Sequence, residues 1–205
     1  MCTSAQLCYC NIMDDKKLVW TQEESRNVFE CRIFSIRESA CRSPDNKLGT
    51  YTIIDAGDWA ITVPLVHGKN GPQFVMVRQW RHGARELSLE FPGGVFEPHE
   101  NPEQAAAREL REETGYRPGK ICKIGEMSPN PAIMSNRVHF FLAEDLLNTG
   151  KREPDNDEYL ETVLVDVDEV IKNMGRPPYV HALMGAALSL YLQKTRSGNP
   201  GPCPA

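Results

Sequence analysis

Hydrophobic and polar residues alternate along much of the first half of the chain, with the period of two that is typical of half-buried β-strands. The turn-forming sequence SPDNKLG at 43–49 predicts a hairpin between two of these stretches. Asn70-Gly71 is among the stronger short-range hairpin signals and predicts a second hairpin. We therefore expect strands at 27–39, 50–55, 60–67 and 73–80.

The clearest helix is predicted between Asn101 and Gly115. Asn101 is followed by Pro102 and, three residues after the cap, by Gln104, which is typical of a helix start with a capping box. Gly115 is the residue type that most often ends a helix. Farther along, the pattern predicts strands at 120–127, 137–144 and 162–167 and helices at 168–174 and 180–194.

Strands mixed with two or three helices predict an α/β fold of the α+β kind, an α/β/α sandwich with an extra N-terminal antiparallel β element. We expect an N-terminal β subdomain over 20–56 and a main domain over 57–195. The segments 1–19 and 196–205 are expected to be loose tails, the second because it is rich in Pro and Gly.

The size and composition are those of one ordinary soluble domain or of one domain with an appendage, since 40% of the 205 residues are hydrophobic and 25% are charged. A chain of this length buries enough surface to fold without a disulfide or metal staple. The sequence has no run of 18 apolar residues, and its N-terminus lacks the features of a secretory signal. We therefore expect no membrane partner and no classical export.

The charge balance argues against a nucleic-acid partner. The formal net charge is -5 at pH 7, which leaves no basic excess to displace counterions from a phosphate backbone. An anionic substrate would have to be met by a local cluster of cations or by a metal ion. The seven cysteines, an odd number without a CxxC pair, favour reduced thiols and a cytoplasmic location over a disulfide framework.

Three carboxylates on the predicted helix are candidates for metal binding. Glu109, Glu112 and Glu113 have offsets of 0, 3 and 4, which places all three on one helix face. Like charges at that spacing cost stability, whereas a hard divalent cation such as Mg²⁺ binds oxygen ligands and neutralises their repulsion. The alternative is a solvated helix face stabilised by pairs of Glu and Arg.

Two arginines and two glycines accompany these carboxylates. Arg108 and Arg111 on the same helix are placed to hold the carboxylates or to neutralise them. Gly93-Gly94, after a proline, is expected to let the backbone turn tightly, so that a main-chain carbonyl can point at the same metal ion.

The spacing of Gly94, Glu100 and the run RELREETGY at 108–116 resembles the Nudix hydrolase signature, G-x5-E-x7-R-E-U-x-E-E-x-G-U, at every defined position. Only Tyr116, in the last place, is an aromatic residue where an aliphatic one is commoner. The resemblance implies a Nudix fold, in which a mixed sheet lies between helices and the signature forms a loop, helix and loop that hold Mg²⁺ or Mn²⁺. Members of this family split a nucleoside diphosphate linked to another moiety.

The resemblance also assigns roles to residues of the signature. Arg108 and Glu100 would orient the carboxylates, and Glu112 would bind the metal directly or through water. The metal ligands that the resemblance implies are the Gly93 carbonyl, Glu109, Glu112 and Glu113.

From about residue 25 to 195 the flanks look like those of the ADP-ribose pyrophosphatase group. In that group an arginine at the place of Arg81 contacts the substrate phosphates, and a glutamate at the place of Glu90 lies at the site. Arg78 would add positive potential, although on a regular strand it faces away from Arg81. Pro131 lies where the ADP-ribose-specific enzymes carry a proline, but the loop around it differs from the commoner sequence of the group.

The general base implied by the resemblance lies on an acidic loop before the last strand. The segment KREPDNDEYL at 151–160 fits, and alignment of the strand that follows puts Glu158 at the base position. Asp155, Asp157 and Glu161 stay open as alternatives, as does a loop whose acids are only solvated.

We therefore expect a metal-dependent enzyme that hydrolyses the diphosphate bond of ADP-ribose to AMP and ribose 5-phosphate. The alternatives are another nucleoside diphosphate sugar or a dinucleotide as the substrate, and a sensor that binds a nucleotide sugar without hydrolysis. A sensor is expected to lose a metal-binding glutamate, and this sequence retains all of them. The resemblance further implies a homodimer, in which the N-terminal β element completes the partner's site.

Overall fold

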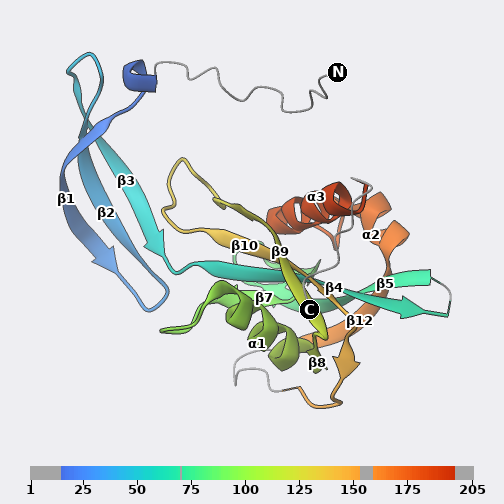
Figure 1. The fold of residues 1–205 in the computed structure, drawn as a ribbon. Helices are drawn as coiled ribbons and strands as arrows, with labels where there is room; N and C mark the ends of the chain where they lie inside the picture. The colour runs from blue at the N-terminus through green and yellow to red at the C-terminus, as the bar shows by residue number, and fades with distance from the viewer. Residues whose placement is uncertain (1–14, 70, 153–158, 197–205) are drawn as a thin grey trace, which may run out of the picture. The chain divides into compact units, whose positions relative to one another are not determined.

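The chain forms two compact units, each built on its own sheet. The first unit comprises the chain up to Ala56 together with Pro131–Ser135, and the second comprises Gly57–Asn130 and the chain from Asn136 onward. Figure 1 shows the N-terminal strands of the first unit in blue and cyan, and the helices of the second in green and red. The residues that the computed structural model describes are 15–69, 71–152 and 159–196.

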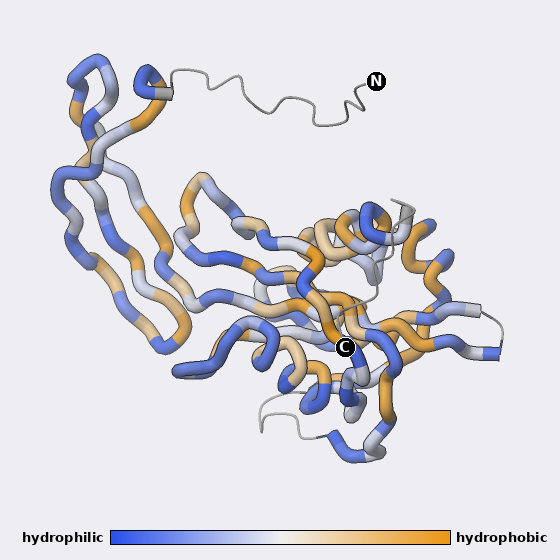
Figure 2. The backbone as a smooth tube through the Cα atoms, in the orientation of Figure 1, coloured by the Kyte–Doolittle hydropathy of each residue, from blue (hydrophilic) through white to orange (hydrophobic). Residues whose placement is uncertain are grey.

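A three-stranded antiparallel sheet forms most of the first unit. Its elements are a short 3-10 helix η1 (Asp15–Lys17) and the strands β1 (Thr21–Glu30), β2 (Phe34–Arg42) and β3 (Leu48–Ala56), in the order β1-β2-β3. The predicted hairpin around SPDNKLG is confirmed, because the Ser43 N–H donates to the Lys47 carbonyl at 2.9 Å between β2 and β3. Strand β1 is exposed along its whole length, and Figure 2 shows its tube mostly in hydrophilic and pale colours.

The single strand predicted at 27–39 is wrong, because the chain turns in its middle. Strand β1 ends at Glu30, and the Cys31 N–H then donates to the Phe34 carbonyl at 3.0 Å to close the turn. Ile33 lies in this turn and is exposed. The alternation of apolar and polar residues slips by one residue at Ile33-Phe34, but no Gly, Pro, Asn or Asp marks residues 31–33 as a turn.

The segment Pro131–Ser135 pairs with β3 although it is distant in sequence. The Ile54 N–H donates to the Ile133 carbonyl at 2.7 Å, and the Ser135 N–H donates to the Ile54 carbonyl at 3.1 Å. The Ser135 hydroxyl donates to Asp55 Oδ1 at 2.6 Å. Pro131, which the sequence predicts to bind substrate, thus belongs to the first unit.

A seven-stranded mixed sheet forms the centre of the second unit. Its strands are β4 (Trp59–Gly68), β5 (Gly71–Arg81), β6 (Glu86–Glu90), β7 (Gly93–Val95), β9 (Lys120–Met127), β10 (Val138–Glu144) and β12 (Leu160–Asp166). The order is β12-β5-β4-β10-β9, with β6 paired to β5 and β7 to β4; only β10 and β4 run parallel. A separate pair joins β8 (Tyr116–Arg117) to β11 (Leu147–Asn148).

Helices cover both faces of this sheet, as Figure 1 shows. They are α1 (Pro102–Thr114), α2 (Val167–Asn173) and α3 (Ala182–Arg196), and the last two correspond to the helices predicted at 168–174 and 180–194. Ile61 and Val63 of β4 pack in one cluster with α3, whereas Ala60 packs with residues of α1, because successive side chains of a strand point to opposite faces. The predicted α/β/α sandwich with a mixed sheet is confirmed.

Helix α1 begins and ends as predicted. Asn101 Oδ1 accepts a hydrogen bond from the Gln104 N–H at 2.9 Å, and Gln104 Oε1 accepts one from the Asn101 N–H at 3.1 Å, which completes the capping box. Gly115 ends the helix with a φ of 75°, in the left-handed region that glycine adopts without strain.

None of the helices in the described part of the chain combines the length and the apolar character that a membrane crossing requires.

The expectation of reduced thiols is wrong at Cys122 and at the cysteine bonded to it. Cys31 and Cys41 are free, but Cys122 of β9 is disulfide-bonded. A disulfide requires two cysteines whose Cα atoms lie close together in the folded chain. Sequence spacing does not give that distance, so the missing CxxC pair was no guide to it.

Tyr179 connects the loop before α3 to helix α2, and its side chain is buried. Its hydroxyl donates to Glu169 Oε1 at 2.8 Å. Burial, followed by the hydrogen bond and charge of Glu169, raises the pKa of Tyr179 to about 12 from its usual 10.0. Between these two values the folded protein binds more protons than the unfolded protein, so this stabilisation is complete below about pH 10 and is lost as the pH rises toward 12.

We predict that Tyr179→Phe lowers the free energy of unfolding at neutral pH by about 1 kcal/mol, because the hydrogen bond is lost. The fall in stability above pH 10 should also become smaller than in the wild type. Urea unfolding at neutral and alkaline pH measures both effects. Tyr159→Phe is the control, since Tyr159 is 88% exposed. If the free energy of unfolding fell as much above pH 10 in Tyr179→Phe as in this control, the prediction would be contradicted.

Candidate active site

Arg108 holds three glutamates through one guanidinium group. Its Nε and Nη2 donate to the two carboxylate oxygens of Glu100 at 2.9 and 3.0 Å. Its Nη1 donates to Glu109 Oε1 at 2.9 Å and to Glu112 Oε2 at 3.0 Å. Nη2 also donates to the Val95 carbonyl at 3.1 Å. The loop that precedes α1 and two carboxylates of α1 are therefore joined at a single side chain.

Within this ion network, Arg108 and its glutamate partners stabilise one another's charged forms. The hydrogen bonds that Arg108 donates to Glu100 chiefly raise the pKa of Arg108; burial opposes them, and the charge of Glu109 adds to them. The Arg108 hydrogen bonds lower the pKa of Glu100 against the opposing effect of burial. The Arg108 side chain is only 18% exposed and that of Glu100 only 11%, so solvent screens the pair less than it would a surface ion pair. Both groups are therefore charged at neutral pH.

The two glycines of β7 allow the helix carboxylates to approach the sheet. A Cβ atom on Gly94 would overlap the Glu109 carboxylate, and one on Gly93 would overlap the carbonyl oxygen of Ala60. The Gly93 N–H donates to Glu113 Oε2 at 3.0 Å, and Glu113 is only 3% exposed. The tight turn expected at Gly93-Gly94 is wrong, because both residues pair with β4 as a strand. Close approach, not turning, explains why these residues are glycines.

The donor set of this region fits a hard divalent cation. Glu109, Glu112 and Glu113 offer carboxylate oxygens, which suit Mg²⁺ or Mn²⁺ and not the softer metals that prefer sulfur or imidazole. Two of these carboxylates already converge on one Arg108 nitrogen, and the third lies at the Gly93 amide. Within the described ranges, no group of three or more His, Cys, Asp or Glu side chains is placed so that it could hold a metal ion. The assignment of metal ligands stays a prediction.

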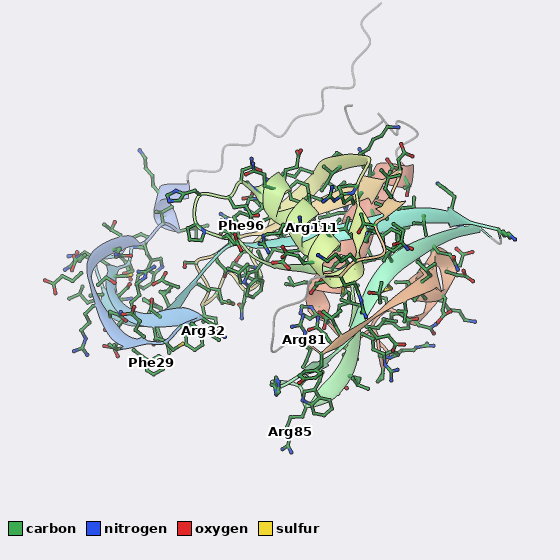
Figure 3. All side chains as sticks on the ribbon, turned by 90° about the horizontal axis from the view of Figure 1, so that it is seen from below. Phe29, Arg32, Arg81, Arg85, Phe96 and Arg111 are labelled. Carbon is green, nitrogen blue, oxygen red and sulfur yellow. The ribbon has the colours of Figure 1, made fainter. Side chains whose placement is uncertain are left out.

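A second ion pair lies at the junction of β5 and β6. Arg81 Nε donates to Glu90 Oε1 at 2.9 Å, and Arg81 Nη2 donates to Glu90 Oε2 at 2.6 Å. Burial alone would raise the pKa of Glu90, but the hydrogen bonds and charge of Arg81, with smaller effects from His181 and Ser88, lower it overall. Figure 3 shows Arg81 on the β5–β6 hairpin, with Arg85 at its far end. The structure thus pairs two residues that the sequence predicts at the substrate site.

Among the other predicted residues, Arg78 makes its ion pair outside these two clusters. Arg78 of β5 forms an ion pair with Glu161 of β12, with Nη1 and Oε2 3.8 Å apart, and both side chains are largely exposed. Pro131 begins the segment bound to β3 in the first unit. Glu158 and the alternative bases at 155 and 157 lie outside the described residues.

Sequence reasoning missed His181, whose Nε2 lies 3.9 Å from Glu90 Oε2. None of the five histidines has the spacing of a metal site, so no sequence signal assigned a role to this one. Its only local sign is its position just before α3, where a polar side chain can cap the first turn.

Three comparisons with known proteins bear on the family and the fold. A family model described as the NUDIX domain matches residues 58–183. The chain is 33% identical over 147 residues to the ADP-ribose pyrophosphatase of Bacillus subtilis (strain 168), covering 71% of this chain and 77% of that protein. It is 25% identical over 153 residues to the methanol dehydrogenase activator of Bacillus methanolicus, covering 73% and 80%. A crystal structure of an ADP compounds hydrolase shares the fold, with a TM-score of 0.74 at 22% identity, over 86% of this chain and 96% of that chain.

We predict that Arg108→Ala destabilises the protein strongly, because it leaves Glu100, Glu109 and Glu112 without their shared cation. Removal of one partner from a buried ion network typically costs about 3 kcal/mol. Arg108→Lys should recover part of this loss, since lysine keeps the charge but cannot form the two-pronged contact with Glu100. Urea unfolding measures the effect, and Arg117→Ala on the exposed face of β8 is the control. Equal stability of Arg108→Ala and Arg117→Ala would show that the network is not structural.

Proposed function

Because the chain belongs to the Nudix family, we propose that it is a metal-dependent hydrolase that cleaves the diphosphate bond of ADP-ribose to give AMP and ribose 5-phosphate. The observation that carries the proposal is the arrangement of the α1 carboxylates. Glu109 and Glu112 converge on one nitrogen of Arg108, and Glu113 lies at the Gly93 amide. The name of the Bacillus subtilis relative supports ADP-ribose as the substrate.

The residues proposed to hold the metal ion each offer an oxygen donor. They are Gly93, through its carbonyl, Glu109, Glu112 and Glu113. A bound Mg²⁺ or Mn²⁺ would supply positive charge that neutralises the diphosphate oxygens and makes water a stronger acid. Both ions suit these donors, so the choice between them is left to experiment.

The other residues of the proposed site bind the substrate, orient other side chains or accept a proton. Arg108 would keep the α1 carboxylates in place, because Glu100 fixes it through two hydrogen bonds. Arg81 would bind a substrate phosphate, since its side chain is 41% exposed and its guanidinium is fixed by the ion pair with the buried Glu90. Glu158 is proposed to accept a proton from the attacking water as the water oxygen bonds to phosphorus and the bond to the bridging oxygen breaks.

A second candidate keeps the fold and the metal but changes the substrate to another nucleoside diphosphate sugar or to a dinucleotide. The loop that contains Pro131 favours this alternative, because its sequence differs from the commoner one in ADP-ribose pyrophosphatases. The name of the Bacillus methanolicus relative also differs from that of an ADP-ribose enzyme. The homodimer and the cytoplasmic location expected from the sequence stay predictions.

We predict that phosphate release from ADP-ribose, coupled to alkaline phosphatase at millimolar Mg²⁺, exceeds release from GDP-mannose, UDP-glucose, NADH and diadenosine diphosphate by at least about tenfold. EDTA should abolish the hydrolysis, because the charge on the diphosphate would no longer be neutralised. This control is read as AMP formation by chromatography, since EDTA also removes the metal ions of the phosphatase. A clear preference for another compound in the panel would favour the second candidate. A panel with no EDTA-sensitive release at all would reject the hydrolase.

We predict that Glu109→Gln and Glu113→Gln each lower kcat/KM at saturating Mg²⁺ by about 100-fold or more, because even indirect partners of a metal typically cost about 10- to 100-fold. Glutamine keeps an acceptor for the Gly93 N–H, so the fold should survive. Glu103→Gln is the matched control, an exposed carboxylate in the first turn of the same helix. Near wild-type turnover in Glu113→Gln would overturn the assignment of the metal helix.

A further inference from the structure

His181 presents a defined nitrogen to the buried carboxylate of Glu90. Its Nδ1 accepts a hydrogen bond from the Leu183 N–H at 3.2 Å, within the first turn of α3. A nitrogen that accepts carries no hydrogen, so the neutral ring has its hydrogen on Nε2. Nε2 is the nitrogen that lies 3.9 Å from Glu90 Oε2, a separation longer than a hydrogen bond. The contact is therefore electrostatic, with an N–H dipole facing a carboxylate.

Backbone contacts on both sides of Glu90 tie β6 to the start of α3. The Leu89 N–H donates to the Pro178 carbonyl at 3.0 Å, and the Phe91 N–H donates to Met184 Sδ at 2.7 Å. Met184 is only 1% exposed, so this second contact is enclosed by the core. Because Glu90 lies between the two tied residues, its distance from His181 is set by the packing of α3 on β6.

Glu90 in turn determines the orientation of Arg81. Its side chain is 4% exposed, whereas those of Arg81 and His181 are 41% and 31% exposed. A buried carboxylate is costly unless its oxygens have partners, and the partners here lie on different elements. Arg81 on β5 donates to both oxygens, and His181 before α3 faces Oε2 alone. A rotation of the Glu90 carboxylate would therefore turn the Arg81 guanidinium with it.

The protonation state of His181 agrees with this arrangement. Burial lowers the pKa of His181, the charge of Glu90 opposes that effect, and the charge of Arg81 adds to it. The overall direction is downward, so the imidazole is neutral at pH 7 and keeps both its Nδ1 acceptor and its Nε2 donor.

We infer that His181 is a positioning residue for substrate binding, which acts through Glu90 to hold the Arg81 guanidinium in the orientation that meets the diphosphate. The inference rests on the proposed function, in which Arg81 binds a substrate phosphate. His181 itself need not touch the substrate. The competing interpretation is that His181 only caps the first turn of α3.

Two substitutions separate these interpretations. Asn at position 181 keeps an acceptor for the Leu183 N–H, since Asn is a favoured helix cap, but is too short to reach Glu90. Gln reaches farther with its amide N–H but is a poorer cap. We expect His181→Asn to raise KM for ADP-ribose about fivefold with kcat within about twofold and Tm near wild type. We expect His181→Gln to keep KM closer to wild type while lowering Tm.

A double-mutant cycle tests whether His181 acts through Glu90. In a Glu90→Gln background, His181→Asn should change KM by less than about twofold, because the carboxylate it orients is gone. His67→Asn is the control for histidine removal, since His67 is exposed on the β4–β5 hairpin. A KM increase that is equally large in both backgrounds would overturn the inference, as would an unchanged KM in His181→Asn.

Failure of the inference and failure of the proposed function give different results. If the wild-type protein shows no EDTA-sensitive hydrolysis of ADP-ribose, the proposed function fails. The wild type, His181→Asn, Glu90→Gln and the double variant are then compared by urea unfolding. Coupling between the two substitutions in the free energy of unfolding supports the contact, and strict additivity rejects it. If the wild type is active but the KM effects are absent, the inference alone fails.

Discussion

The guanidinium group of Arg108 is the interaction on which the proposed site depends. Carboxylates at positions i, i+3 and i+4 of a helix repel one another, and burial against a sheet makes that repulsion stronger because solvent screens it less. Arg108 offsets it by placing one planar cation among Glu100, Glu109 and Glu112. The same group ties the helix to strand β7 through the Val95 carbonyl. Charge compensation and positioning are thus performed by one side chain.

The close approach of helix α1 to the sheet follows from the same constraint. A Cβ atom at position 94 would overlap the Glu109 carboxylate, and one at position 93 would overlap the Ala60 carbonyl oxygen of β4, so glycine at both places keeps this approach open. Glu113, on the same helix face, accepts the Gly93 N–H and adds a contact that Arg108 does not supply. The site is built from short-range contacts between one helix and one three-residue strand. Such a site can be rigid without a large interface.

The features that could be predicted from the sequence are those set by neighbouring residues. The capping box at Asn101, the glycine at the end of α1 and the shared face of the three glutamates depend on spacing within one helix, and the structure contains all of them. The turn at Cys31 contains none of the Gly, Pro, Asn or Asp residues that signal a turn, so the sequence predicts one strand through it. The disulfide at Cys122 and the contact of His181 with Glu90 join residues brought together only by folding. No period or spacing along the chain encodes such distances.

The pairing of Pro131–Ser135 with β3 means that neither unit is a continuous stretch of chain. The polypeptide leaves the first unit after Ala56, returns to it for five residues and leaves it again. A fragment that starts at Gly57 would carry those five residues without the Ile54 amide and carbonyl that bond to them. A fragment that stops at Ala56 would lack the last piece of its own sheet. Separation of the two units therefore requires a graft of residues 131–135 onto the first unit, because a single truncation always divides one of the units.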